Sequence, residues 1–139
     1  MSQFRQGPNV SFKVNQATTL SAYRIVKPAA GNNSVALWDT ATAHILGVTL
    51  EDSKGATGTS VLVAIYGTAR LGAGASVSAG ALVTGQTATG LGIEDASRGY
   101  MDTATAIVAY TLGIALDAAD TNSVFEVLIR PSNLRFDFV

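Results

Sequence analysis

Few side chains in this sequence have the chemistry of a catalytic or metal-binding group. His44 is the only histidine among the 139 residues, and the chain contains no cysteine. A site that needs two histidines or a thiolate ligand is therefore excluded within one chain. The serines at 34, 60 and 78 have no base at a spacing typical of serine hydrolases. We interpret His44 as a packed or surface side chain.

Two aspartates stand at equivalent places in a repeated pentapeptide. Asp39 opens the sequence Asp-Thr-Ala-Thr-Ala, and Asp102 opens an identical copy. Paired carboxylates are a residue type that general acid–base catalysis uses. An Asp before Thr is more typical of a turn, in which the carboxylate accepts backbone N–H groups. We therefore predict that both aspartates cap turns.

Two further patterns carry weak chemical signals. Glu51 and Asp52 lie in a loop equivalent to the one that holds Asp117 and Asp120. Carboxylates suit hard cations, but this spacing matches no EF-hand loop, so solvated acidic turns are expected. The turn at 72–74, Gly-Ala-Gly, lacks the third glycine, the lysine and the following helix of phosphate-binding loops. The sequence predicts no enzyme, no cofactor and no metal site.

The composition points to a protein that acts through its surfaces. Apolar residues make up 47% of the chain, charged residues only 14%, and the net charge is −1. This charge gives no general attraction to nucleic acid or to anionic membranes. So few charges leave apolar and small neutral surface exposed, which typically ends in an interface with copies of the chain or with another protein. An alanine-rich monomer is the alternative.

No targeting or membrane signal is evident. The first six residues lack the apolar core of a signal peptide. No run approaches the ~20 apolar residues of a membrane-spanning helix. The sequence predicts a soluble protein that is made and kept in a cytoplasm and has no membrane partner.

A repeated β unit organises the chain. After the pentapeptide, 46–51 resembles 112–117, and 60–65 resembles 123–128 when the serines at 60 and 123 are aligned. Upstream, 19–26 resembles 76–83. The separation between the copies grows along the chain, which places insertions in loops of the second copy such as 85–99. We infer a fold of two similar units, at about 19–67 and 76–131.

Short strands are expected throughout. Alternation of apolar and polar residues predicts a half-buried strand at 10–14, and the unbroken β-formers at 61–66 predict a central strand. Other expected strands lie at 23–26, 35–38, 45–50, 82–83, 111–116 and 124–130, and the segment 94–109 is ambiguous, with a possible helical turn at 95–98 or 102–106. The predicted fold is all-β, a small duplicated barrel or sandwich with little helix.

The ends of the chain are expected to lie outside this single β domain. Residues 1–11 form an arm, 12–131 the domain, and 132–139 a tail, because Pro131 is expected to stop strand pairing. Apolar residues alternate in the tail, so it is either the last strand of its own sheet or an addition to a neighbour's sheet. Partner contacts are predicted at the termini, at Phe4, Arg5, Arg130, Arg135, Phe136 and Phe138.

The order of several motifs resembles one family. The stretch 74–84 reads Gly-Ala-Ser-Val-Ser-Ala-Gly-Ala-Leu-Val-Thr, 112–116 reads Leu-Gly-Ile-Ala-Leu, and 126–129 reads Glu-Val-Leu-Ile. This looks like the head decoration, or capsid cement, proteins of tailed bacteriophages, in the order of motifs over residues 12–130. The aromatic residues do not interleave with basic ones as on a single-strand nucleic-acid platform, so no nucleic-acid partner is expected.

The resemblance implies a function without catalysis. Such proteins are β-rich domains that bind the outside of the expanded phage head, often as trimers, and stabilise it. The expected partners are the major capsid protein and further copies of the chain in a homotrimer, and the expected location is the outer capsid surface of a virion. The alternatives are another virion module, such as a tail or head fibre, or a small β-barrel ligand-binding domain.

Overall fold

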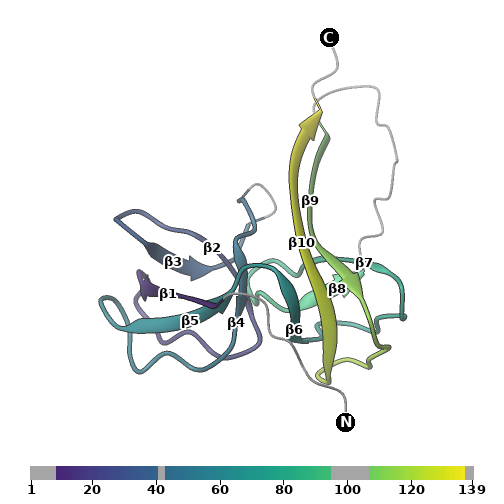
Figure 1. Cartoon of the computed structure of the whole chain (residues 1–139), viewed down its shortest axis with the longest axis horizontal. Coiled ribbons are helices and arrows are strands. Elements are labelled where there is room, and N and C mark those ends of the chain that lie inside the picture. The colour runs from purple at the N-terminus through teal and green to yellow at the C-terminus, as the bar shows by residue number, and fades with distance from the viewer. Residues whose placement is uncertain (1–8, 41–42, 95–106, 137–139) are drawn as a thin grey trace.

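The computed structural model describes residues 9–40, 43–94 and 107–136 and contains only strands, turns and loops in these ranges (Figure 1). The all-β prediction is confirmed. The strands are β1 (Asn9–Val14), β2 (Ile25–Pro28), β3 (Ser34–Leu37), β4 (Gly47–Thr49), β5 (Ser60–Ala64), β6 (Gly67–Gly72), β7 (Leu82–Gly85), β8 (Gly92–Glu94), β9 (Ile107–Ala115) and β10 (Val124–Phe136).

The first five strands form a closed barrel in the order β1-β3-β2-β4-β5, which we call the first barrel. β1 closes it by pairing antiparallel with β5 and parallel with β3. As the alternation in β1 predicts, Val14 is buried while Lys13 is exposed. The interior is filled by small branched side chains, namely Val14, Leu20, Val26, Val35, Val61 and Val63.

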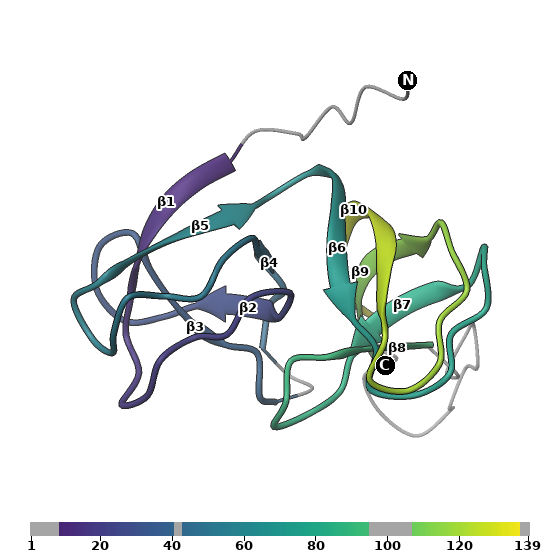
Figure 2. The same ribbon diagram turned by 90° about the horizontal axis from the view of Figure 1, so that it is seen from below.

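The other five strands form a second sheet in the order β6-β10-β9-β7-β8 (Figure 2). Its edge strands meet at one parallel bridge, between Ala73 just after β6 and Gly92 in β8. The same topological position in the first barrel is the parallel pair Val14–Val35 of β1 and β3. The second sheet therefore follows the course of the first barrel but is incompletely closed.

The two halves agree in register as well as in topology. In the first barrel Ile25 pairs with Val48, and β4 then pairs with β5. In the second sheet Leu82 pairs with Ile114, and β9 then pairs with β10. Residues with positive φ also recur at equivalent places, in the pairs Tyr23 and Gly80, Gly31 and Ala88, Asn33 and Gly90, Gly58 and Asn122.

The register corrects one part of the sequence comparison. Aligning the serines at 60 and 123 would match Val61 with Val124. In the structure Val48 pairs with Ala64, and the equivalent Ile114 pairs with Leu128, which instead matches Val61 with Phe125. Both Val61 and Phe125 are buried, whereas Val124 is exposed. Because side chains alternate between faces, the one-residue slip in the sequence match exchanged the core and surface positions of this strand.

The two halves are joined where the second sheet is open. In the first barrel the Lys13 N–H donates directly to the Asn33 carbonyl, at 2.8 Å. The equivalent residues of the second sheet, Gly72 and Gly90, bond instead to the first barrel. Gly72 N–H donates to the Tyr23 carbonyl at 3.0 Å, and Gly90 O accepts from the Ile25 N–H at 2.7 Å. The start of β2 thus occupies the gap between the edges of the second sheet.

Apolar packing continues across this junction. Ile25, Val48 and Ala64 lie on the outer face of the first barrel, and each is at most 1% exposed. They belong to the same apolar cluster as Leu71 and Val127 in the interior of the second sheet. The outer face of the first barrel therefore serves as part of the core of the second sheet.

Pro131 does not stop strand pairing, contrary to the prediction. Ile129 pairs with Gly113, and pairing resumes at Ser132 opposite Thr111, so β10 carries one extra residue around Arg130 and Pro131. A bulge is one of the few places in a strand where proline fits, because it needs no ladder hydrogen bond there. Residues 132–136 accordingly continue the chain's own sheet, which is the first of the two alternatives for the tail.

Candidate interaction surface

His44 lies in a setting that offers no catalytic partner among the described residues. Its exposed ring packs edge-on against the ring of Tyr110, with centroids 5.3 Å apart and an interplanar angle of 86°. Within the described ranges no group of three or more His, Cys, Asp or Glu side chains lies close enough together to hold a metal ion. His44 is a surface side chain in an aromatic contact.

The acidic residues singled out in the sequence lie in separate environments. The Asp39 carboxylate pairs with the Lys27 ammonium group at 2.6 Å. Positions 41 and 42, which Asp39 would cap, and Asp102 lie outside the described residues, so the predicted caps stay predictions. Asp52 accepts a hydrogen bond from the Ala22 N–H at 2.7 Å and thereby ties its loop to the segment before β2.

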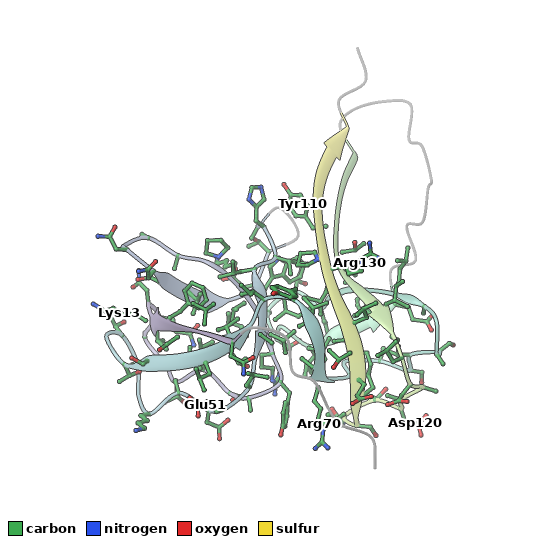
Figure 3. The ribbon with its side chains drawn as sticks, viewed as in Figure 1. Lys13, Glu51, Arg70, Tyr110, Asp120 and Arg130 are labelled. Carbon is green, nitrogen blue, oxygen red and sulfur yellow. The ribbon has the colours of Figure 1, made fainter. Side chains whose placement is uncertain are left out.

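The other acidic side chains are on the surface. Glu51, Asp117 and Asp120 are exposed, in the loops that follow β4 and β9. In Figure 3, Glu51 and Asp120 lie on different halves of the molecule. The two acidic loops therefore do not combine into one site.

The Gly-Ala-Gly turn at 72–74 is held by hydrogen bonds to other segments of the chain. Its three N–H groups donate to the carbonyls of Tyr23, Ser123 and Gly92, at 3.0, 2.8 and 2.9 Å. A phosphate-binding turn needs free N–H groups that point at the anion. Because all three donors are used within the protein, this turn has no donor left for an anion.

A shallow depression lies where the first barrel meets the loop between β7 and β8. It is lined in part by Gln16, Thr18, Arg24, Leu37 and Thr89. Arg24 donates to the Thr89 carbonyl at 3.0 Å, and the Gln16 side-chain oxygen accepts from the Leu37 N–H at 2.8 Å. These polar groups hold the two halves and the loops together, which makes the depression a poor candidate for ligand binding.

The predicted partner contacts divide into described and undescribed residues. Arg130 is exposed at the bulge of β10. Arg135 and Phe136 lie at the C-terminal end of β10, where they pair with Val108 and Ile107 of β9. The remaining three predicted contacts, Phe4, Arg5 and Phe138, lie outside the described residues.

Arg130, Arg135 and Phe136 all lie on β10, and the last two lie in a part of it that has only one partner strand among the described strands. Beyond the bulge, residues 107–111 of β9 and 132–136 of β10 pair with each other, and among the described strands neither pairs there with a third one. We call this two-stranded element the ribbon. It projects from the body of the molecule, as Figure 1 shows, with Arg130 and Tyr110 near its base in Figure 3. The Tyr110 carbonyl accepts a hydrogen bond from the Thr84 hydroxyl at 2.7 Å, and strand edges that have no further strand beside them, as here among the described strands, can add a strand from another chain.

The sequence reasoning missed a second surface, on the outside of the second sheet. Large apolar side chains are exposed there, with Leu82 at 36%, Leu116 at 43% and Val124 at 49%. In the sequence these residues read as parts of apolar strands and give no sign of which face is covered. The repeat itself carried the missing signal, because Leu82 is equivalent to Ile25 at the junction between the halves.

The comparisons with known proteins bear on the fold. No family model and no curated protein matches the chain. Among solved structures, it is similar to the N base of the head fiber protein gp8.5 of bacteriophage phi29, with a TM-score of 0.62 and 18% sequence identity. The match covers 91% of this chain and 98% of that one. At this identity the likeness shows a common fold, and it includes both halves of the molecule.

Among the described residues, no helix has the length and apolar character needed to cross a membrane.

Proposed function

We propose that this chain is a structural protein of a phage virion, which binds the outer surface of the expanded capsid and stabilises it. The observation that carries the proposal is the shared fold with a phage head fiber base, over nearly the whole of both chains. The motif order that resembles capsid decoration proteins supports the same location. In this role the protein needs no catalytic site and no cofactor.

The architecture suits a binding role of this kind. The two halves together form one pre-formed β body, so this body loses little conformational entropy when it docks. A decoration protein acts through an interface of about 1,000 Å² or more with the major capsid protein. If three copies associate, simultaneous contacts make detachment slow without requiring a strong individual contact. Homotrimeric assembly is part of the proposal.

The ribbon is the proposed capsid contact. It projects beyond the two barrel-like halves and carries Arg135 and Phe136 in its terminal pairs. An isolated two-stranded ribbon is only marginally stable in water, so contact with a further surface would stabilise it. Arginine and aromatic residues are also the types that dominate the energy of many interfaces.

Co-sedimentation with shells of the parent phage tests the proposal. The full chain should bind expanded, undecorated shells saturably, with a stoichiometry fixed by the lattice, and should bind unexpanded shells more weakly. Replacing both Arg135 and Phe136 by alanine should weaken binding by at least ~10-fold. The control Lys54→Ala removes a charge from an exposed loop of the first barrel and should leave binding unchanged. A folded chain that binds neither kind of shell would contradict a capsid role.

A second candidate is that the chain forms the base of a head fiber. The structural similarity to a head fiber base favours this function. Electron microscopy of virions labelled with antibody against the chain separates the two. Label spread over the whole lattice fits decoration, whereas label at the foot of each projecting fiber fits a fiber base.

A further inference from the structure

One apolar row occurs twice in the molecule, and within the described ranges only one of the two copies is covered. In the first barrel the row runs across β2, β4 and β5 through Ile25, Val48 and Ala64. These three side chains are at most 1% exposed, because the second sheet packs on them. The row therefore defines the face by which one β unit of this fold receives another.

Among the described residues, nothing covers the equivalent row of the second sheet in this way. It runs across β7, β9 and β10 through Leu82, Ile114 and Leu128, in the same register. Leu82 is 36% exposed, and Ile114 and Leu128 are half-buried. Together with the exposed Leu116 and Val124, these residues form what we call the open face. In repeat architectures the terminal unit presents such a face unless something caps it.

We propose that the open face is the surface through which copies of this chain associate with one another. The inference deepens the self-association included in the proposed function and names the surface that carries it. The face is mainly aliphatic, as self-association interfaces typically are, and it contains one carboxylate, that of Glu126, between Val124 and Leu128 along β10. It carries both signs of charge, because Glu126 is paired across the strands with Arg70, and Arg130 lies two residues beyond Leu128 in β10.

The mixed charges favour another copy of the chain over a partner of one charge sign. Arg70 and Arg130 are exposed, and Asp117 follows directly after Leu116 as an exposed carboxylate. Positive groups of one copy can therefore lie opposite negative groups of the next. The net charge of −1 adds almost no overall repulsion between copies.

The association is expected to close rather than to continue into a filament. If one chain packed on the next in the way that its own halves pack, β1 and β3 of the first barrel would have to separate, as the edges of the second sheet do. The hydrogen bond from the Lys13 N–H to the Asn33 carbonyl holds β1 and β3 together. Lys13 and Asn33 also stand where the second sheet has Gly72 and Gly90. A Cβ at Gly90 would lie 2.9 Å from the Ile25 carbonyl oxygen, so a side chain at this position, as at Asn33, would crowd an entering strand. Head-to-tail stacking is thereby disfavoured, and the open faces of the three copies instead meet around one common axis, which closes the assembly.

The test is the mass of the full chain in solution, measured by light scattering and sedimentation equilibrium. The wild-type chain should be oligomeric, and the double variant Leu82→Glu, Leu116→Glu should be monomeric, with its dissociation constant raised by at least ~100-fold because unpaired carboxylates would be buried. The matched control is Leu62→Glu. Leu62 is 37% exposed on the first barrel, and its equivalent in the second sheet is already Glu126.

Two outcomes would overturn the proposal: a wild-type chain that stays monomeric at high micromolar concentration, or a folded double variant that keeps the wild-type mass. A second measurement decides the matter if the double variant does not fold. The chain has no cysteine, so Leu116→Cys should form disulfide-linked pairs under mild oxidation, and Leu62→Cys should not. Equal cross-linking of the two variants would also contradict the proposal. Neither measurement uses a capsid. A negative result would therefore not contradict shell binding, and a failure to bind shells would not contradict association through the open face.

Discussion

Two glycines show at the residue scale why the repeat contains Leu-Gly in both copies. A Cβ atom at Gly47 would collide with the carbonyl oxygen of Ala64, and one at Gly113 would collide with that of Leu128. Ala64 and Leu128 occupy equivalent positions in β5 and β10. The same close approach of two strands is thus built twice. The sequence comparison found the repeated dipeptide, but only the structure gives its physical reason.

Substitution of Gly113 tests this reason. Gly113→Ala should lower the free energy of unfolding by about 3 kcal/mol, because the added methyl group overlaps backbone and one strand must move. Urea denaturation followed by circular dichroism measures the change. Gly80→Ala is the control, since Gly80 has a φ of +84° but nothing within 4 Å of an added Cβ. It should cost only about 1 kcal/mol, from backbone strain alone. Equal costs at the two sites would contradict a steric role for Gly113.

Core side chains differ between the halves in a compensating way. The interior position held by Val61 in the first barrel is held by the larger Phe125 in the second sheet. Opposite this ring, Gly92 stands where the first barrel has Val35, and a Cβ on Gly92 would lie 3.1 Å from the Phe125 ring. Such exchanges keep the interior filled while erasing residue identity. This is why the sequence match slipped by one residue in this strand, where matching by residue type paired Val61 with Val124.

At the scale of elements, the sequence predicted best the strands whose own composition determines them. The alternation at 10–14 and the run of β-formers at 61–66 correspond to β1 and β5. β8 (Gly92–Glu94) was missed because it is short and opens with glycine, in a stretch that reads as a loop. It exists because β7 pairs with it, as β2 pairs with β3 in the first barrel. Tertiary pairing, which local composition does not encode, forms this strand.

The predicted partner contacts were recognisable as residue types but not as one element. Arginine and phenylalanine near the C-terminus indicated an interface, yet Pro131 indicated the end of the sheet. The structure shows a bulge at Pro131 and a continued β10, which places Arg135 and Phe136 on the ribbon. The open face was missed for a different reason. Which side of an apolar strand is covered depends on how the two halves are arranged. The sequence of a single strand does not determine that arrangement.

The ribbon should be the least protected part of the described sheet in the free protein. Backbone amides in residues 132–136 should exchange with deuterium roughly 100-fold faster than those in 124–129, where β10 has strands on both sides. Mass spectrometry of peptides from the two parts of β10 measures the ratio, with β5 of the first barrel as a protected reference. On shells, the proposed contact should slow exchange in the ribbon. Equal protection of both parts of β10 in the free protein would argue against a ribbon that depends on a partner.

At the scale of the whole molecule, the two halves share one core, and we expect them to unfold as one cooperative unit rather than as two linked domains. The start of β2 is bonded into the gap of the second sheet, at Gly72 and Gly90. The outer row of the first barrel is buried in the cluster that contains Phe125 and Leu112. Separating the halves would expose this row and leave the bonds across the gap unmade. The second sheet has no completed core of its own without the first barrel.

Calorimetry tests this cooperativity. The chain should unfold in a single transition, with an enthalpy on the order of 100 kcal/mol for its 139 residues and a van't Hoff enthalpy equal to the calorimetric one for each protomer. Ile25→Asp places a carboxylate at a position that is 0% exposed between the halves. It should destabilise the second sheet along with the first barrel, because a buried unpaired charge cannot be tolerated in their shared core. Leu62→Asp introduces the same group on the outer surface of the first barrel and should leave the transition nearly unchanged. Two separate transitions in the wild-type chain, of which Ile25→Asp removes only one, would mean that the halves fold independently and that the junction is a contact between finished domains.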